Sequence, residues 1–215
     1  MNPERFHRLK AVLAARQPDL TVLMERVHKH HNFSAILRNC DAVGVMEAHA
    51  VLAESDPEIH LGVSAGAARW VPVTTHPDTA SAVQALRTRG FRVLAAHLSE
   101  GGVDYRAVDY TRPTALMMGA ELFGVSQEGL EAADGHVVIP MRGFVQSLNV
   151  SVATALLLFE AQRQRAAAGM YDAPRLDPEA FRRRLFEWAY PREAEALRSA
   201  GQPYPALDGD GRWTE

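Results

Sequence analysis

The sequence predicts an α/β protein with a mostly parallel sheet and helices on both of its faces. Apolar runs rich in β-branched residues alternate, along the middle of the chain, with segments of helical periodicity. Strands that alternate with helices in this way form parallel sheets that are buried on both faces. The chain has 215 residues, of which 47% are hydrophobic and 23% charged, and this suits one soluble domain with appendages.

The expected strands are short apolar runs bounded by turn residues. They span residues 21–27, 47–51, 70–74, 91–98, 114–118 and 137–141. The expected helices between them span residues 34–43, 78–89 and 126–133, and a longer apolar helix follows at 148–168. Gly90 and Gly169 stand where the second and the last of these helices are expected to end.

Short helical extensions are expected on both sides of the main domain, which we place at residues 19–170. Residues 1–18 predict an amphipathic helix that begins at Asn2-Pro3 and has a basic side. Residues 171–215 predict a helix that begins at Asp177-Pro178, followed by an irregular tail. The basic side of the first helix carries Arg5, Arg8, Lys10 and Arg16.

Charge and cysteine content narrow the function classes. The net charge of -3 gives no global sign of nucleic-acid binding, so any RNA contact is expected from local basic patches. The one cysteine, Cys40, allows no intramolecular disulfide, which is compatible with the cytoplasm that we expect for this protein. Residues 1–20 lack the pattern of a secretory signal, and no apolar run predicts a membrane span.

Two common nucleotide-binding motifs are missing from the sequence. No G-x-G-x-x-G opens a helix after the first expected strand, and no G-x-x-x-x-G-K-[ST] occurs. A dinucleotide-dependent oxidoreductase and a P-loop enzyme are therefore disfavoured. Three polar segments set between apolar runs are the remaining candidates for a site.

The first polar segment contains Asn32, Ser34 and Arg38. Ser34 is expected to cap the following helix, Arg38 lies one turn into it, and Asn32 lies in the preceding loop. From spacing alone, Asn32 could equally be a turn former and Arg38 a surface residue. Three histidines just before the helix, His28, His30 and His31, could suggest a metal, but no cysteine or carboxylate lies close to them, so no metal is expected.

The second and third segments each follow an expected strand. In the second, Glu121 stands in a turn between Gly119 and Gly124, which on its own could be an ordinary β-turn. In the third, a Pro/Gly loop leads to Ser147 and Asn149 at the start of the long apolar helix. One cap suffices for a helix N-terminus, yet several polar residues converge there, where negative charge is also favoured.

These three segments resemble the motifs of one family, the SpoU branch of the SPOUT RNA methyltransferases. The matching motifs are N-x-S-A-I-x-R at residues 32–38, G-x-E-x-x-G-[VI]-[ST] at 119–126 and I-P-M-x-G-x-x-x-S-L-N-V-S-V-A at 139–153. Runs near the start, at residues 109–114 and at 159–165 are similar to the TrmH group of that family, which methylates the ribose 2'-hydroxyl of guanosine 18 in the D-loop of tRNA.

The resemblance implies a fold, a cofactor and an assembly. The fold would contain a deep C-terminal trefoil knot, a rare exception to unthreaded topology. The knot loops would bind S-adenosylmethionine, and a homodimer would place the first motif of one subunit beside the cofactor of the other. The implied cofactor-binding residues are Ala96, Leu98, Gly119, Ile139, Met141, Gly143 and Leu148.

The resemblance also implies roles for individual side chains. Arg38 matches the family's catalytic arginine, and Asn32, Glu121, Ser147 and Asn149 would organise it and the substrate ribose. The tRNA would be bound by the basic terminal helices and by neighbouring residues. The expected RNA-binding residues are Arg5, Arg8, Lys10, Arg16, His31, Arg163 and Arg165.

Some positions depart from the family pattern. His30 replaces a proline, Ala96 stands where relatives often have threonine, and residues 54–60 are acidic where some relatives are basic. Two other functions stay open: the same chemistry on another RNA such as rRNA, and a catalytically silent RNA-binding paralogue. The presence of Arg38, Glu121, Ser147 and Asn149 disfavours the second.

Overall fold

The computed structural model describes residues 1–52, 69–99 and 101–213, and the chain divides into two compact units. Gln17–Ala168 form the larger unit, and Met1–Arg16 together with Gly169–Glu215 form the smaller. The acidic segment at residues 54–60 lies outside the described residues. No helix in the described part of the chain is long and apolar enough to cross a membrane.

Within the described residues, the larger unit contains a sheet of seven strands that are all parallel. Their order across the sheet is β3-β2-β1-β6-β4-β7-β5. The strands are β1 (Leu20–Glu25), β2 (Ala48–Val51), β3 (Val73–His76), β4 (Arg92–Ala96), β5 (Val103–Asp104), β6 (Thr114–Met118) and β7 (Gly135–Val138). The expected α/β class with a parallel sheet is therefore confirmed.

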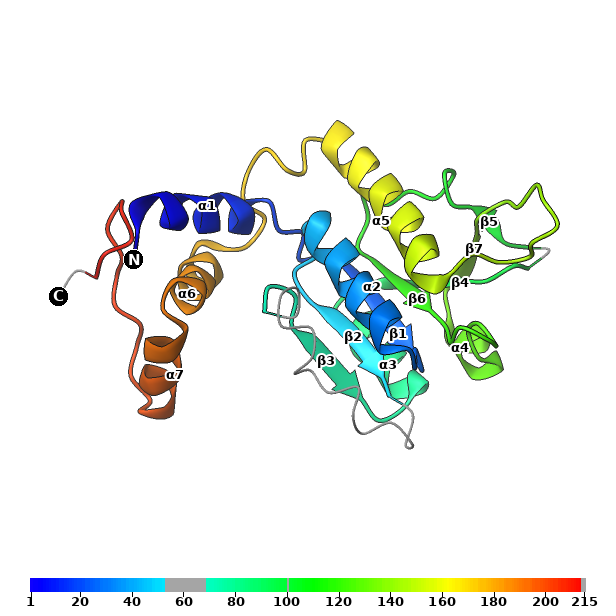
Figure 1. The fold of residues 1–215 in the computed structure, drawn as a ribbon, viewed down its shortest axis with the longest axis horizontal. Helices are drawn as coiled ribbons and strands as arrows, with labels where there is room; N and C mark the ends of the chain where they lie inside the picture. Colours follow the sequence, from blue (N-terminus) through cyan, green and yellow to red (C-terminus); the bar gives the residue numbers. More distant parts are fainter. Residues whose placement is uncertain (53–68, 100, 214–215) are drawn as a thin grey trace. The chain divides into compact units, whose positions relative to one another are not determined.

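Helices cover both faces of this sheet, as Figure 1 shows. Successive side chains of a strand point to opposite faces, so Val22 and Met24 of β1 join one apolar cluster while Leu23 joins the other. The helices α2 (His30–Ala42) and α5 (Val150–Ala167) contribute to the first cluster. The helices α3 (Thr79–Thr88) and α4 (Gln127–Ala132) contribute to the second.

The smaller unit joins the two ends of the chain. It contains α1 (Pro3–Ala14), α6 (Pro178–Ala189) and α7 (Pro191–Ser199), with α1 packed on α6 and α6 on α7. The apolar stripe of α1 is buried, and Arg16 lies over the Trp188 ring at 5.2 Å. The tail also packs here, because the Tyr204 ring stacks on Phe186 with centroids 4.8 Å apart.

Several boundaries differ from the expectations. The strand expected at residues 137–141 is β7 at 135–138, and the one expected at 70–74 is β3 at 73–76. Neither the two-residue strand β5 nor the helix α7 was expected from periodicity. The helix expected to begin at Ser34 begins at His30, four residues earlier. The residue just before it, Lys29, donates its backbone N–H to Glu121.

Candidate active site

The residues expected to bind the cofactor meet at one edge of the sheet. Ala96 ends β4, Gly119 follows β6 and Ile139 follows β7, and these three strands are neighbours in the order β6-β4-β7. Because the strands are parallel, their carboxyl ends lie at the same edge, where open α/β sheets bind ligands. Leu98, Met141, Gly143 and Leu148 lie in the loops that continue from β4 and β7.

This edge combines close-packed backbone with accessible apolar side chains. A Cβ atom on Gly119 would lie 2.0 Å from the backbone carbon of Gly124 and 2.0 Å from the nitrogen of Val125, so only glycine fits there. The Gly124 N–H donates to the Ala120 carbonyl at 2.8 Å, which closes the turn tightly. Leu98 is 57% exposed, so its apolar side chain is accessible at this edge.

The three polar segments are joined by hydrogen bonds through Asn32. The Asn32 Nδ2 donates to Glu121 Oε1 at 2.9 Å, and the Asn149 Nδ2 donates to Asn32 Oδ1 at 3.1 Å. Asn32 is only 2% exposed, so its amide is fixed in this bridging position. Residues that are 89 and 117 positions apart in the sequence are thus held in one network.

Glu121 also binds the backbone at the start of α2. Its carboxylate accepts hydrogen bonds from the Lys29 N–H at 3.0 Å and from the His28 N–H at 3.3 Å. Burial acts to raise the pKa of Glu121, but the Asn32 amide and the surrounding backbone N–H groups outweigh it, and the pKa is lowered from its ordinary value. The carboxylate therefore stays ionised and anchors the amino end of α2.

Two expectations for the first segment are corrected by this arrangement. Ser34 is not the N-cap: the cap position is Lys29, which makes no side-chain capping bond, and Ser34 lies inside α2. Asn32 likewise lies in the first turn of the helix rather than in a loop. Glu121, from a distant segment, accepts from the N–H of the cap residue Lys29 and from that of His28 before it, which local capping rules could not reveal.

At the third segment, Asn149 has two roles at once. Its Oδ1 accepts from the Ser151 N–H at 2.9 Å, so it caps α5, while its Nδ2 reaches Asn32. Capping and site organisation are therefore combined in one side chain. Ser147, by contrast, is exposed and makes no hydrogen bond within the described part of the chain.

Arg38 does not join this network. It lies six residues after Asn32 on α2, which places it about 9 Å further along the helix axis. Its side chain is exposed and forms no hydrogen bond or ion pair with the residues that the structure describes. An exposed guanidinium of this kind is free to bind a phosphate or carboxylate from another molecule.

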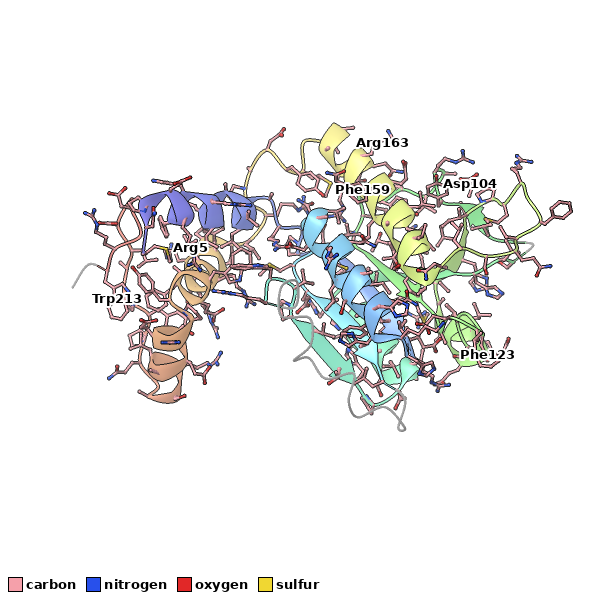
Figure 2. The ribbon with its side chains drawn as sticks, viewed as in Figure 1. Arg5, Asp104, Phe123, Phe159, Arg163 and Trp213 are labelled. Atoms are coloured by element: carbon pink, nitrogen blue, oxygen red, sulfur yellow. The ribbon has the colours of Figure 1, made fainter. Side chains whose placement is uncertain are left out.

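The expected RNA-binding residues divide into exposed and buried groups. Arg5, Arg8, Lys10, His31 and Arg163 are exposed, and Arg163 pairs with Glu160 on its own helix. Figure 2 shows Arg163 projecting from α5.

Arg16 and Arg165 are 1% and 0% exposed, so the structure does not present their side chains to an RNA in the way that the expectation requires. Arg165 donates to the Asp19 carboxylate at 2.5 Å and to the carbonyl of Tyr110 at 2.9 Å, and it thereby ties the end of α5 to the start of β1. A buried arginine with these partners holds the fold together.

A buried carboxylate beside the site was not anticipated. Glu25, the last residue of β1, is 1% exposed and bonds to Ser126 in the second segment. The sequence did carry a signal, because an acid at the end of a fully buried strand needs hydrogen-bond donors nearby.

A parallel α/β sheet, a glycine-dependent turn at its carboxyl edge and an amide network joining three motif segments define the class of protein. The chain belongs to the SpoU rRNA methylase family, whose model matches residues 19–159. A second model, described as SpoU, rRNA methylase, C-terminal, matches residues 163–214.

Several individual proteins resemble the chain over most of its length. The tRNA (guanosine(18)-2'-O)-methyltransferase of Thermus thermophilus is 56% identical, over 86% of this chain and 95% of that protein. The protein of the same name from Escherichia coli is 52% identical, over 98% of this chain and 93% of that protein.

Solved structures of RNA methyltransferases also resemble the fold of this chain. The TrmH/SpoU tRNA modifying enzyme of Aquifex aeolicus superposes with a TM-score of 0.80 at 46% identity, covering 87% of this chain and 96% of that one. The AdoMet-bound rRNA methyltransferase of Sinorhizobium meliloti has a TM-score of 0.60 at 30% identity, covering 72% of this chain and 59% of that one.

Proposed function

We propose that this protein transfers a methyl group from S-adenosylmethionine to the ribose 2'-hydroxyl of guanosine 18 in tRNA. The observation that carries the proposal is the Glu121–Asn32–Asn149 network beside the carboxyl ends of β6, β4 and β7. The choice of tRNA rests on relatives of that name at 56% and 52% identity. The Escherichia coli match extends through both terminal segments, which family-wide chemistry alone does not require.

The residues at the sheet edge fit S-adenosylmethionine. The close backbone at Gly119 offers polar N–H and carbonyl groups near the ligand, and Leu98, Ile139 and Met141 offer apolar contact for an adenine ring. When bound, the cofactor supplies a methyl group on a positive sulfonium, an activated donor that needs no metal. Ala96 presents only a methyl side chain, so contacts there are apolar or from the backbone.

The chain's own residues then bind and orient the substrate. A ribose hydroxyl is a weak nucleophile, so the site must hold its oxygen close to the methyl carbon and in line with the bond that breaks. We assign Ser147 and Asn149 to the part of the site that receives the ribose. Asn32, itself held by Glu121, accepts from the Asn149 side chain and holds it in place. We assign Arg38 to anchor a phosphate next to the target ribose, because its guanidinium stays protonated and binds phosphate well.

We further propose that the site is shared between two subunits of a homodimer. Arg38 lies outside the network of its own chain, so a second copy is needed to bring an arginine to it. A candidate contact surface exists on α5, where the apolar side chains of Val152, Leu156 and Phe159 lie on one face and are 37–48% exposed. Figure 2 marks Phe159, and also Phe123, which is 85% exposed.

The path of the chain after β7 supports the trefoil knot that the sequence resemblance implies. In the order β1-β6-β4-β7, strand β7 is two places from β6 on one side, and β1 is next to β6 on the other. The helix α5, which follows β7 in the chain, packs on α2, which follows β1. Residues 139–149 must therefore return across the sheet edge, and we propose that they thread the loop around Gly119 in doing so. A structure with S-adenosylmethionine bound would trace this crossing directly.

We propose that the terminal extensions, residues 1–18 and 171–215, bind tRNA and that residues 19–170 carry the chemistry. Arg5, Arg8 and Lys10 are exposed on α1, and phosphate contacts of this kind position an RNA without reading its sequence. The protein would act in the cytoplasm, where the buried free thiol of Cys40 stays reduced.

A methyl-transfer assay tests the proposed function. The purified protein should transfer labelled methyl groups to an unmodified tRNA transcript and not to the same transcript with guanosine 18 replaced. Equal labelling of both transcripts would move the target to another nucleotide. Transfer to rRNA fragments but not to tRNA would favour the rRNA function, and no transfer to any RNA would favour a silent RNA-binding protein.

A further inference from the structure

Glu25 is a carboxylate buried within the sheet unit, at the end of β1. Burying a charge is costly unless it is fully hydrogen-bonded, and Glu25 receives three bonds. Its Oε1 accepts from the hydroxyls of Thr79 at 2.7 Å and of Ser126 at 2.6 Å, and its Oε2 accepts from the Ser126 N–H at 2.7 Å. Two of the three donors thus belong to one residue of the second motif segment.

Ser126 is the point at which the 119–126 turn ends and α4 begins. Its hydroxyl also accepts from the Gly129 N–H at 3.1 Å, which caps α4. A Cβ on Gly129 would lie 2.9 Å and 3.2 Å from the two carboxylate oxygens of Glu25, so α4 approaches the carboxylate closely. Glu25 therefore fixes the position and direction of the chain as it leaves the turn.

Two sets of hydrogen bonds join the 119–126 segment to the chain between β1 and α2, and each side supplies the carboxylate in one of them. Glu25, at the end of β1, accepts from the backbone N–H of Ser126 in the second segment, and Glu121 of the second segment accepts from the backbone N–H groups of His28 and Lys29, just before the first motif. Between these two sets of bonds, Arg26 adopts a φ of 54°, and it is the one non-glycine residue with positive φ in the described part of the chain. Strain of this kind collects where a site fixes its backbone.

We infer that Glu25 is a positioning residue of the active site. It holds Ser126, at the end of the 119–126 turn, and thereby fixes the position of the Glu121 carboxylate and, through Glu121, that of the Asn32 amide. This inference rests on the proposed function only in that the activity to be measured is methyl transfer to tRNA. Within the described residues, Glu25 forms no hydrogen bond with the site network or with the expected cofactor residues. Its effect passes through Ser126 and the seven residues that precede it.

The Thr79 bond provides a matched control. Thr79 begins α3, is fully buried and binds the same carboxylate oxygen, but α3 carries none of the site residues. Thr79→Val removes this bond at nearly constant shape, whereas Glu25→Gln weakens the bonds to the turn. Both variants should lose some thermal stability. Only Glu25→Gln should lower kcat for methyl transfer, by about tenfold or more, when measured well below its Tm.

A double-mutant cycle separates positioning from simple stabilisation. If Glu25 acts through Glu121, the kcat effects of Glu25→Gln and Glu121→Gln should be strongly non-additive, with the double variant close to the worse single variant. Additive effects, or a Glu25→Gln enzyme with wild-type kcat and a lowered Tm, would overturn the inference. Should Glu25→Gln not fold, Ser126→Ala replaces it in the cycle with the same expectation.

Amide hydrogen exchange gives a readout that needs no RNA. In the free protein, exchange at residues 28–32 and 120–125 should be about tenfold faster in Glu25→Gln than in wild type, and unchanged in Thr79→Val. Equal protection in all three proteins would contradict the positioning role. Because exchange does not depend on the substrate, failure of the tRNA assay and failure of this inference remain distinguishable.

Discussion

At the scale of single residues, the site depends on what each side chain can donate and accept. A carboxylate accepts only, so Glu121 suits the free N–H groups of a helix start, while the amide of Asn32 donates to Glu121 and accepts from Asn149. Asp at position 32 could not donate to Glu121. Asn32 is therefore specified by its neighbours as well as by the reaction.

Arg38→Ala should abolish methyl transfer, with kcat reduced at least about 100-fold, because the substrate phosphate loses its anchor. Binding of S-adenosylmethionine, measured by calorimetry, should be unchanged, since Arg38 forms no hydrogen bond or ion pair with the expected cofactor-binding residues in the described part of its own chain. Arg38→Lys keeps the charge but loses the planar fork, so it should retain only part of the activity. Near-normal turnover in Arg38→Ala would remove Arg38 from the mechanism.

Glu121 should make stability depend on pH in the acid range. Its pKa is lowered on folding from 4.5, so the stability that it contributes is complete above that value and is lost as the pH falls through the lowered pKa. Glu121→Gln should therefore lower Tm at pH 7, and the difference from wild type should shrink below about pH 4.5. Thermal unfolding of both proteins between pH 7 and pH 3 measures this, and a constant difference would exclude the ionised network.

At the scale of elements, the apolar patterns of the strands and helices determine the fold, and the loops between them carry the site residues. Each parallel strand ends at the same edge, and the loops after β4, β6 and β7 depart from it in different ways. The loop after β6 is tight, because the backbone of Gly124 and Val125 returns onto Gly119. This turn supplies both Glu121 and a wall of the expected cofactor site.

Gly119→Ala should disrupt that turn. The added methyl group would overlap backbone atoms 2.0 Å away, which cannot move like a flexible side chain, so we expect a loss of stability of about 1–3 kcal/mol or more. Affinity for S-adenosylmethionine should fall with it. Gly209→Ala is the matched control, since a Cβ there meets nothing within 4 Å. Wild-type affinity in folded Gly119→Ala would show that the turn does not form the cofactor site.

Local patterns predicted the elements well where local forces decide them. Asn2, Asp78 and Asp177 cap helices, and Gly90 and Gly169 have the positive φ that ends them. The start of α2 was misplaced because its acceptor, Glu121, is 92 residues from Lys29 along the chain. The burial of Arg165 was missed for the same reason, since Asp19 and Tyr110 come together with it only in the folded sheet unit.

At the scale of the whole molecule, a single chain does not bring all of the expected site residues together. The network and the expected cofactor residues lie at one sheet edge, whereas Arg38 is exposed and separate from them. In the proposed homodimer, the exposed apolar face of α5 would be the surface on which the second copy docks. Similarity to tRNA methyltransferases over nearly the full length could be anticipated from the motifs, whereas the proposed knot and the proposed dimer depend on chain paths that periodicity does not encode.

Subunit complementation tests the shared site most directly. Arg38→Ala and Ser147→Ala should each be nearly inactive as homodimers. When the two are co-expressed and mixed dimers form, one of the two sites in each mixed dimer would combine Arg38 from one subunit with Ser147 from the other. A random mixture should therefore recover about a quarter of wild-type methyl transfer to tRNA. A mixture that contains mixed dimers yet stays as inactive as its parents would contradict the shared site.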